Sequence, residues 1–371
     1  MTFELNTTNN VKDTDAFVNG KLNAKSPIVE IFSALVSGED TSKYGAKVDK
    51  VVARVSDLAT QSLAGDASAV AELNTIVKYA IEPKLLEAIK LFSFMGRYKK
   101  IGYDAQPMMK TYKYESVDSR FQASSGDVPF AAHSFKEYPI STKTISSGYA
   151  VDYRELQSGN FDGTVAEGMN QVQIDMQNKA VYYVIAKMYN AIKNAKGVKH
   201  FAESAGITET GVKDMQKVVR RYGKVAIMGD YSVSSQLNDF AGYKTFGANT
   251  IPFGADAVAD EIRKTGLLNY YGGSNVVELA NGFNFTKMKA DKSSYELYLP
   301  EGLLFFVPQS TVVSPLQIFL RGGLTSMSGD DLVTRQRITR FDMEIGADVA
   351  EGLEDWIGLI SDTNFEVPQL P

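Results

Sequence analysis

The sequence contains no cysteine and only two histidines among its 371 residues. The lack of cysteine excludes disulfides, thiolate metal ligands and thiolate nucleophiles, and it fits a reducing cytosol. The two histidines, His133 and His200, lie too far apart in the sequence for an H-E-x-x-H zinc motif. A Ser-His-Asp triad would have to use one of them, and both positions are typical of ordinary surface or boundary histidines.

Phosphate-binding loops and membrane spans are also missing. There is no G-x-x-x-x-G-K-[ST] or G-x-G-x-x-G motif. The longest apolar run, "AVYYVIA", is far shorter than the ~18 residues of a membrane span. Residues 1–10 carry no positive charge and precede no apolar segment, so no signal peptide is predicted. The sequence therefore predicts no cofactor, no metal and no membrane partner, and no motif points to an enzyme.

The length and composition are those of an ordinary globular chain. A chain of 371 residues exceeds the roughly 250–300 residues at which a single core stops growing, so two or more lobes are expected. Its 44% hydrophobic and 22% charged residues exclude a disordered or fibrous protein. A net charge of −5 argues against a general nucleic-acid-coating protein, although a local basic patch is compatible with it.

A long polar hairpin is predicted over residues 107–148. The stretches "KTYKYESVDSRFQ" and "HSFKEYPISTKTISSG" have strand character but keep both faces largely polar. Between them, "ASSGDVPFAA" contributes Gly126, Asp127 and Pro129 as turn residues. Such a hairpin has almost no core of its own, and an isolated two-stranded hairpin is marginally stable in water. We therefore expect its faces to lie against another surface.

Helices surround this hairpin in the sequence. Residues 1–26 are typical of a mobile arm, residues 27–60 mix apolar pieces with Gly and Ser breaks, and a helical pattern begins at Asp66 and is interrupted by Pro83. A much longer helix is predicted from Asp162 to about Lys196, ended by Gly197. At 1.5 Å per residue it would be roughly 50 Å long. Its apolar stripe consists of Val165, Met169, Val172, Met176, Ala180 and Tyr183.

A compact lobe of alternating helices and strands is predicted after the long helix. In "ITETGVKDMQKVVRRYG", Thr210 is the expected N-cap, and the expected buried face is Met215, Val218, Val219 and Tyr222. Further helices are predicted in "YSVSSQLNDF" and "GADAVADEIRKTG", and strands in "KVAIMGD", "NVVELANG" and "SYELYLPEGLLFFVPQ". The last strand, "RQRITRFDMEIGADV", alternates in its second half, and Ile338 breaks its register, which predicts a bulge near Thr339.

The order of these parts carries more information than any single motif. The stretches "GDVPFAAHSFKEYPIS", "ISSGYAVDYRELQSG", "GVKDMQKVVRRYGKVAIMGDYSVSSQL" and "GLLNYYGGSNVVEL" follow one another along the chain. In this order, over roughly residues 65–365, the chain resembles the major capsid proteins of tailed double-stranded DNA bacteriophages, which have the Hong Kong 97-type fold. The resemblance implies an α+β fold in which the hairpin is the E-loop and the long helix is the spine.

The resemblance also implies a division of the chain and a function. The implied parts are an N-terminal arm 1–65, a helical N-terminal segment 66–106, the E-loop 107–148, the spine helix with the first part of a peripheral domain 149–223, an axial domain 224–325 and the second part of the peripheral domain 326–371. The implied function is that of a structural capsid protein in the virion, assembled in the host bacterial cytoplasm. Its implied partners are further copies in pentamers and hexamers, packaged double-stranded DNA bound without sequence specificity, and scaffolding, portal and decoration proteins.

Three groups of residues are candidate intersubunit contacts. Phe121, Asp127 and Phe130 lie on the predicted E-loop, which would overlap a neighbouring copy. In "LLNYYGGSN", Gly272 and Gly273 permit tight turns, and Tyr270 and Tyr271 offer contact area with a polar tip. In an ordinary loop the two tyrosines would instead be split between core and solvent. Arginine forms bidentate pairs with carboxylates, which makes the late strand a candidate contact between capsomers through Arg335, Arg337 and Arg340.

Two departures from the family pattern and two other functions complete the expectations. No charge-rich heptads precede the hairpin, which predicts a separate scaffold protein or none. No lysine and asparagine align with the covalent cross-link of some members, so none is predicted. The alternatives are an encapsulin-type nanocompartment shell, which shares the fold, and a cytosolic enzyme using carboxylates in the α/β lobe. Electron microscopy with analysis of nucleic-acid content separates the two shells, and gel filtration identifies a small oligomer.

Overall fold

The computed structural model describes residues 22–23, 25–36, 39–112, 121, 136–152, 161–240, 243–246, 249–252, 260, 262–289, 292–309, 313–331 and 336–365. The chain divides into two compact units. Unit 1 consists of Met1–Leu91, Lys143–Ala180 and Leu320–Ile345. Unit 2 consists of Phe92–Thr142, Val181–Phe319 and Gly346–Pro371. Each unit is therefore assembled from three separate stretches of the sequence.

The first described part of unit 1 is helical. It contains α2 (Pro27–Val36), the short 3-10 helix η1 (Ser42–Tyr44) and α3 (Lys47–Leu63). Ile28, Val51 and Val55 on these helices are buried. Arg54 of α3 forms an ion pair of 3.0 Å with Glu72 of the next helix. The segment predicted as an N-terminal arm over residues 1–65 thus contains the helices α2 and α3, whose apolar residues recur at helical spacing and pack inward.

The next helix, α4 (Ala67–Met95), passes through Pro83 without a break. The prediction of an interruption there is wrong. A proline inside a helix costs about 3 kcal/mol, because it removes one hydrogen bond and crowds the preceding turn. Buried residues occur on both sides of the proline, with Ile76 before it and Phe92 and Met95 after it. Burial of these side chains keeps the segment helical despite the local cost.

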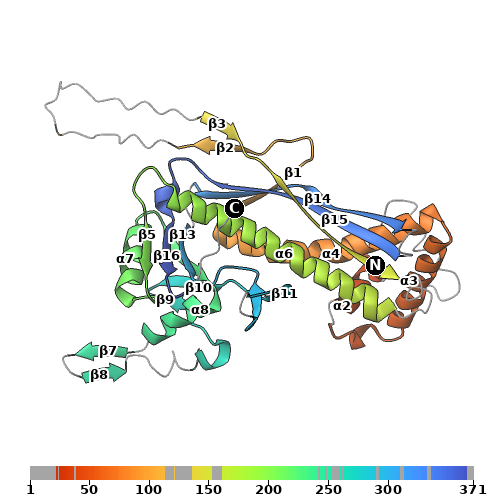
Figure 1. Cartoon of the computed structure of the whole chain (residues 1–371), viewed down its shortest axis with the longest axis horizontal. Helices are drawn as coiled ribbons and strands as arrows, with labels where there is room; N and C mark the ends of the chain where they lie inside the picture. Colours follow the sequence, from red (N-terminus) through yellow and green to blue (C-terminus); the bar gives the residue numbers. More distant parts are fainter. Residues whose placement is uncertain are drawn as a thin grey trace. The chain divides into compact units, whose positions relative to one another are not determined.

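The long helix is confirmed as α6 (Phe161–Lys193). It is drawn as a single unbroken helix in Figure 1. Three residues of the predicted stripe, Val172, Met176 and Ala180, are buried. The helix ends at Lys193, so Gly197 lies in the following loop and not at the helix end.

Four strands form one sheet in the order β1 (Arg97–Ile101), β14 (Leu316–Asp331), β15 (Gln336–Val349) and β4 (Lys143–Asp152). β15 pairs with β4 antiparallel from Gln336 opposite Asp152 to Ile345 opposite Lys143, without a register shift. The predicted bulge near Thr339 is therefore wrong in this pairing. The alternation predicted for the second half of β15 is confirmed, because Phe341, Met343, Ile345 and Val349 are buried.

The second stretch of the predicted hairpin belongs to two strands with different partners. β3 (Lys136–Pro139) pairs with β2 (Met108–Thr111). After three residues outside any strand, β4 begins at Lys143 and pairs with β15 instead. The prediction of a single strand up to residue 148 is wrong, because Ile140 turns into a buried position between the two strands.

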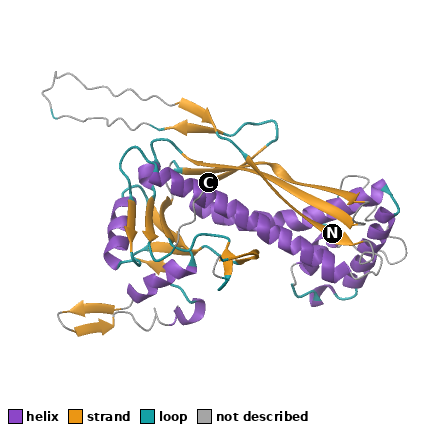
Figure 2. Cartoon of the chain, viewed as in Figure 1, coloured by secondary structure: helices purple, strands orange, loops and turns teal. Residues whose placement is uncertain are grey.

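Unit 2 contains a six-stranded sheet, which lies beside a helix in Figure 2. Its order is β5 (Phe201–Ser204), β16 (Gly358–Asp362), β13 (Leu303–Gln309), β6 (Lys224–Gly229), β10 (Ser274–Glu278) and β9 (Tyr270–Tyr271). The pairs β10–β6 and β16–β5 are parallel, and the other three are antiparallel. β5 and β16 come from outside residues 224–325, so the sheet is not confined to the predicted axial segment.

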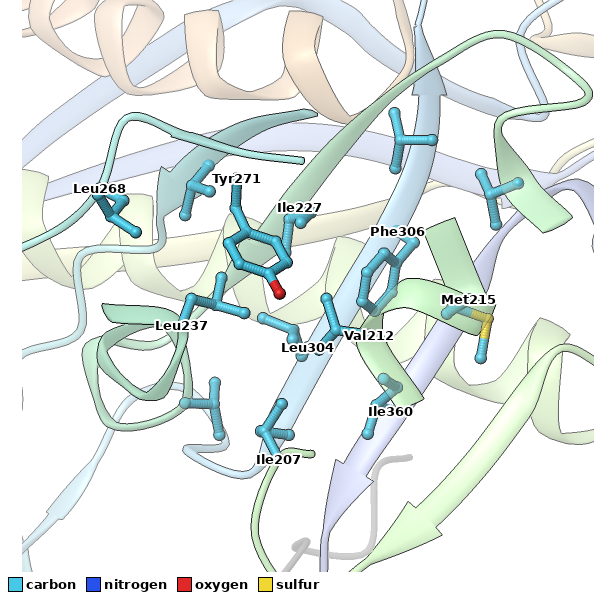
Figure 3. Close-up of a cluster of buried hydrophobic side chains, with 14 residues drawn as sticks. Ile207, Val212, Met215, Ile227, Leu237, Leu268, Tyr271, Leu304, Phe306 and Ile360 are labelled. Atoms are coloured by element: carbon cyan, nitrogen blue, oxygen red, sulfur yellow. The ribbon is translucent and has the colours of Figure 1, made fainter. Parts of the chain in front are cut away.

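One apolar core holds this sheet to its covering helices α7 (Glu209–Val219), α8 (Tyr231–Ser234) and η2 (Ser235–Phe240). Figure 3 shows Val212 and Met215 of α7 facing Leu304, Phe306 and Ile360 of the strands. Burial at about 25 cal/mol per Å² of apolar surface makes this cluster the main stabilising element of the lobe. The predicted strands and helices of this region are confirmed, apart from the details that follow.

The start of α7 differs from the prediction by two residues. Thr208, not Thr210, is the N-cap, and its side chain accepts a hydrogen bond from the Gly211 N–H at 3.2 Å. Glu209 is already helical, which places Thr210 inside the first turn. Val218 and Tyr222 are half-buried, and Val212 is buried in their place.

Three small sheets and a short 3-10 helix remain. β2–β3 is one of the sheets, and the others are β7 (Tyr243–Phe246) with β8 (Asn249–Pro252) and β11 (Phe283–Met288) with β12 (Tyr295–Leu297). The short helix η3 (Glu354–Trp356) precedes β16. The helix predicted in "GADAVADEIRKTG" is described only at residues 260 and 262–265, where it is helical.

Candidate intersubunit surfaces

The base of the β2–β3 hairpin has a core. Met109 of β2 and Ile140 after β3 are buried in a cluster with Phe319, Ala350 and Leu353. Lys110 and Glu137, which face each other across the pair, form an exposed ion pair of 3.3 Å. The prediction of a hairpin with almost no core is therefore wrong at its base, because every second residue of β2 points inward.

The loop before η3 fixes the end of β2. The Tyr112 N–H donates to the Glu351 carbonyl at 2.9 Å, and the Thr111 hydroxyl donates to the Glu351 carboxylate at 3.3 Å. Gly352 has a φ of +89°, and a Cβ there would lie 1.9 Å from the Tyr112 carbonyl oxygen. Only glycine fits this approach, since any other residue would be strained and would overlap the backbone of β2.

The three candidate contacts on the hairpin lie further out along it. Phe121 is described and fully exposed. Asp127 and Phe130 lie outside the described residues. Their assignment to contacts with another copy therefore remains a prediction.

The tyrosine pair is split between solvent and core. Gly272 and Gly273 have φ angles of +57° and +78° and form the two-residue turn between β9 and β10. A turn with positive φ at both positions is the type I′ turn that suits a tight hairpin. Tyr270 is 68% exposed on β9, the edge strand of the sheet, whereas Tyr271 is 6% exposed inside the core. This is the arrangement expected of an ordinary loop, so Tyr271 is not available for a contact.

The same turn is held by the side chain of Gln216. Its Nε2 donates to the Tyr271 carbonyl at 2.9 Å and to the Ser274 hydroxyl at 3.0 Å. Burial, together with the charge of Glu209, raises the pKa of Tyr271 to about 12. The turn is therefore a rigid part of the lobe and not a loose loop.

Of the three candidate arginines on the late strand, the structure describes the side chain of Arg340. Arg340 donates from Nε to the Asp342 Oδ1 at 2.8 Å and from a terminal nitrogen to the Ser146 hydroxyl at 3.1 Å. Burial alone would raise the pKa of Asp342, but hydrogen bonds from Ser146 and Arg340 lower it below its ordinary value. Arg337 lies on β15, but its side chain is outside the described set, as is Arg335. Arg340 is thus engaged within its own sheet.

Sequence reasoning missed an acidic cavity of about 660 Å³ in unit 2. It is lined by Asp348, Glu351, Glu354 and Asp355, with Lys196 as its cationic lining residue. Tyr138, Val198 and Val349 contribute ring and aliphatic surface. The four carboxylates come from the end of β15, from the turn that follows it and from η3, and in the sequence they are only scattered acidic residues.

Sequence reasoning also missed the apolar face of β11–β12. Phe283, Phe285, Met288 and Tyr295 are all exposed. The Phe285 ring lies 5.2 Å from the Tyr295 ring and 6.5 Å from the Phe283 ring, between centroids. The alternation in "FNFTKM" was the signal, since it places two phenylalanines on one face of a short strand.

Metal and membrane sites can be assessed only for the described part of the chain. Within it, no group of three or more His, Cys, Asp or Glu residues is arranged to hold a metal ion. None of its helices is long and apolar enough to cross a membrane.

The described residues thus include a long helix, a hairpin base held by an apolar cluster and exposed aromatic side chains on β11–β12. The model of the family described as "SPbeta prophage-derived putative capsid protein YonB" matches residues 8–361. The chain belongs to this family, and it is a shell-forming structural protein of a phage capsid. The prediction of a phage capsid protein is confirmed. A comparison with curated proteins finds no match.

Several solved structures are similar to the chain. A structure of Microbacterium phage Oxtober96 has a TM-score of 0.48 and 13% identity and covers 71% of this chain and 88% of its own. The capsid structure of Cyanophage P-SCSP1u has a TM-score of 0.46 and 10% identity and covers 73% of this chain and 87% of its own. A virus-like particle from Pyrococcus furiosus has a TM-score of 0.43 and 10% identity over 76% and 97%. The family assignment rests on the match over residues 8–361 and not on these similarities.

Proposed function

We propose that copies of this chain form pentamers and hexamers that close into the icosahedral head of a tailed phage. The head encloses double-stranded DNA held without sequence-specific contacts. Assembly takes place in the cytoplasm of the bacterial host, with scaffolding, portal and decoration proteins as further partners. The coarser statement, a structural capsid protein, follows from family membership over residues 8–361.

The observation that carries the proposal is the anchored base of the β2–β3 hairpin. Met109 and Ile140 anchor the base in an apolar cluster, and the absence of a side chain at Gly352 lets its backbone lie against the Tyr112 carbonyl at the end of β2. More than twenty residues of sequence connect the two strands of this base. A fixed base with a long polar connection suits an overlap onto a neighbouring copy, because head-to-tail contacts of this kind close into rings.

Two further surfaces support rings and contacts between rings. Tyr270 is exposed on the edge strand beside the rigid Gly272–Gly273 turn, which suits a contact repeated around a capsomer axis. We retain Tyr270, Gly272 and Gly273 as axis candidates and leave out Tyr271, which lies in the core. Arg335, Arg337 and Arg340 stay candidates for contacts between capsomers, each worth only about 0–1 kcal/mol if exposed.

The experiment replaces residues 116–130 by a short Gly-Ser turn. We expect the lobe to stay folded, because its core lies in the six-stranded sheet, and we expect closed shells to disappear. Circular dichroism checks the fold, and negative-stain electron microscopy checks the shells. The matched control is Lys110→Ala, which removes an exposed ion pair at the hairpin base and leaves the overlap intact.

Normal shells from the shortened chain would show that the hairpin does not hold neighbouring copies together. Nucleic-acid content provides a second readout on wild-type particles purified from phage-producing cells. Particles filled with double-stranded DNA support a phage head. Particles containing protein cargo and no DNA would favour the encapsulin-type compartment, and a stable small oligomer would favour neither shell.

A further inference from the structure

The β11–β12 sheet carries an apolar face that nothing in the described chain covers. Phe285 is 74% exposed and Met288 is 60% exposed, and Phe283 and Tyr295 flank them. The sheet has two strands only and pairs with no other described strand. Contiguous exposed apolar surface on a soluble protein marks an interaction site. A two-stranded sheet of this size also gains stability when a partner covers it.

The edges of this face are positively charged. Lys287, Lys289 and Lys292 are exposed, and their ammonium groups form no ion pair or hydrogen bond with another described residue. Glu296 is the one acidic side chain described on the two strands. We call Phe283, Phe285, Lys287, Met288, Lys289, Lys292 and Tyr295 the aromatic–lysine knob. A partner must therefore offer apolar surface surrounded by negative charge.

The acidic cavity has this complementary character. Its carboxylates Asp348, Glu351, Glu354 and Asp355 form no ion pair with a described lysine or arginine. Their oxygens accept hydrogen bonds from neutral donors, such as the Tyr222 hydroxyl to Asp355 at 3.1 Å and the Gly352 N–H to Glu354 at 2.8 Å. The four carboxylates outnumber Lys196, the lysine in the cavity lining, so the cavity keeps a net negative charge.

The cavity carboxylates also affect the pKa of a neighbouring tyrosine. The pKa of Tyr138, on the cavity wall, is raised to about 12, mainly by burial and also by the charges of Asp348, Glu351 and Glu354, while a hydrogen bond from the Glu351 N–H lowers it. The cavity therefore favours positive charge. Val198 and Val349 add aliphatic surface to its lining.

We propose that the aromatic–lysine knob of one copy docks into the acidic cavity of a second copy. The lysines pair with the cavity carboxylates, and the phenylalanines cover the aliphatic lining. The two surfaces are complementary in charge, and both belong to unit 2. The inference rests on the proposed self-assembly, for which it names one contact.

The contact joins two different surfaces, so it is head-to-tail. Figure 1 draws β11 away from the C-terminal end of α6, which borders the cavity. The knob of one copy therefore does not fill the cavity of that same copy. A head-to-tail contact leaves a free knob and a free cavity at the two ends of every partial assembly, and it closes into a ring when the rotation allows.

The test exchanges the charges of the two surfaces. The knob variant carries Lys287→Glu, Lys289→Glu and Lys292→Glu, and the cavity variant carries Asp348→Lys, Glu351→Lys and Glu354→Lys. Each alone juxtaposes like charges, and we expect at least a roughly tenfold loss of assembled particles. Circular dichroism and thermal melting show whether each variant is folded. A knob variant that is folded and assembles normally overturns the proposal.

Rescue distinguishes this contact from general damage. A chain with all six exchanges should assemble again, because every knob then meets an oppositely charged cavity in rings of five and of six copies. If a triple exchange does not fold, the single exchanges Lys287→Glu and Glu354→Lys replace it. Folded variants without rescue overturn the docking but leave the shell function standing. Failure of the wild-type chain to assemble counts against the shell itself.

Discussion

Two of the small antiparallel sheets, β2–β3 and β11–β12, differ in where their apolar side chains lie. β2–β3 directs Met109 into a cluster of its own unit and leaves polar residues such as Lys110 and Glu137 outside. β11–β12 leaves Phe285 and Met288 in solvent. Both are two-stranded, and neither is stable alone in water.

The difference shows that amphipathicity on its own does not say where an apolar face is covered. The β2–β3 face is covered within the chain, because Gly352 lets the backbone approach and Phe319 and Leu353 supply partners. No described residue plays that part for β11–β12. In a protein that must bind copies of itself, the uncovered sheet is the one to examine for contacts.

The strongest test of this comparison is the same substitution in the two sheets. Met109→Ala should lower the free energy of unfolding by about 2–5 kcal/mol, because it empties a fully buried position. Met288→Ala, at a position 60% exposed, should change it by less than about 0.5 kcal/mol. Urea unfolding measures both. Equal effects of the two substitutions would mean that β11–β12 is covered within the folded chain.

A second test concerns Gly352, whose backbone lies against the end of β2. Gly352→Ala should cost more than about 1–3 kcal/mol, since it combines a positive φ with an overlap on the Tyr112 carbonyl. Gly65→Ala is the matched control, because Gly65 has a φ of +90° and nothing within 4 Å of an added Cβ. The control should show the cost of the φ angle alone. Equal losses in thermal unfolding would indicate that the loop moves away from β2 at no cost.

The smallest expected effect is a pH dependence at the hairpin base. Tyr138 has a pKa of about 12 in the folded protein, mainly because of burial, against about 10 for an ordinary tyrosine. Its folded pKa is raised, so its contribution to stability is complete below pH 10 and is lost as the pH rises toward 12. The expected loss is about 1 kcal/mol after allowance for partial exposure. With Tyr138→Phe, the free energy of unfolding measured in urea should depend less on pH between 10 and 12. If its pH dependence is the same as in the wild type, other groups cause the loss.

Much of the fold could be predicted from periodicity. The long helix α6 and the buried side of β15 follow directly from apolar residues at intervals of three to four and of two. The helices α2 and α3 were missed because Gly and Ser near their ends resembled the breaks of an arm. Pro83 was given too much weight, since the packing of flanking residues outweighs its local cost.

The candidate surfaces were harder to predict, because they depend on contacts between distant parts of the sequence. The exposure of Tyr270 and burial of Tyr271 follow from the pairing of β9 with β10, which local sequence does not determine. The carboxylates of the acidic cavity meet the end of α6 only after folding, so no spacing in the sequence reports them. The alternation in the sequence indicated an apolar face at Phe285, but it did not indicate that this face is exposed.

The strand order of the six-stranded sheet has a consequence for the timing of synthesis. β16 lies between β5 and β13 and is the one described strand that joins β5 to the sheet. Residues 358–362 leave the ribosome long after residues 201–204, so the sheet remains open through most of translation. β5 therefore has no described strand to pair with until the residues of β16 have been synthesised.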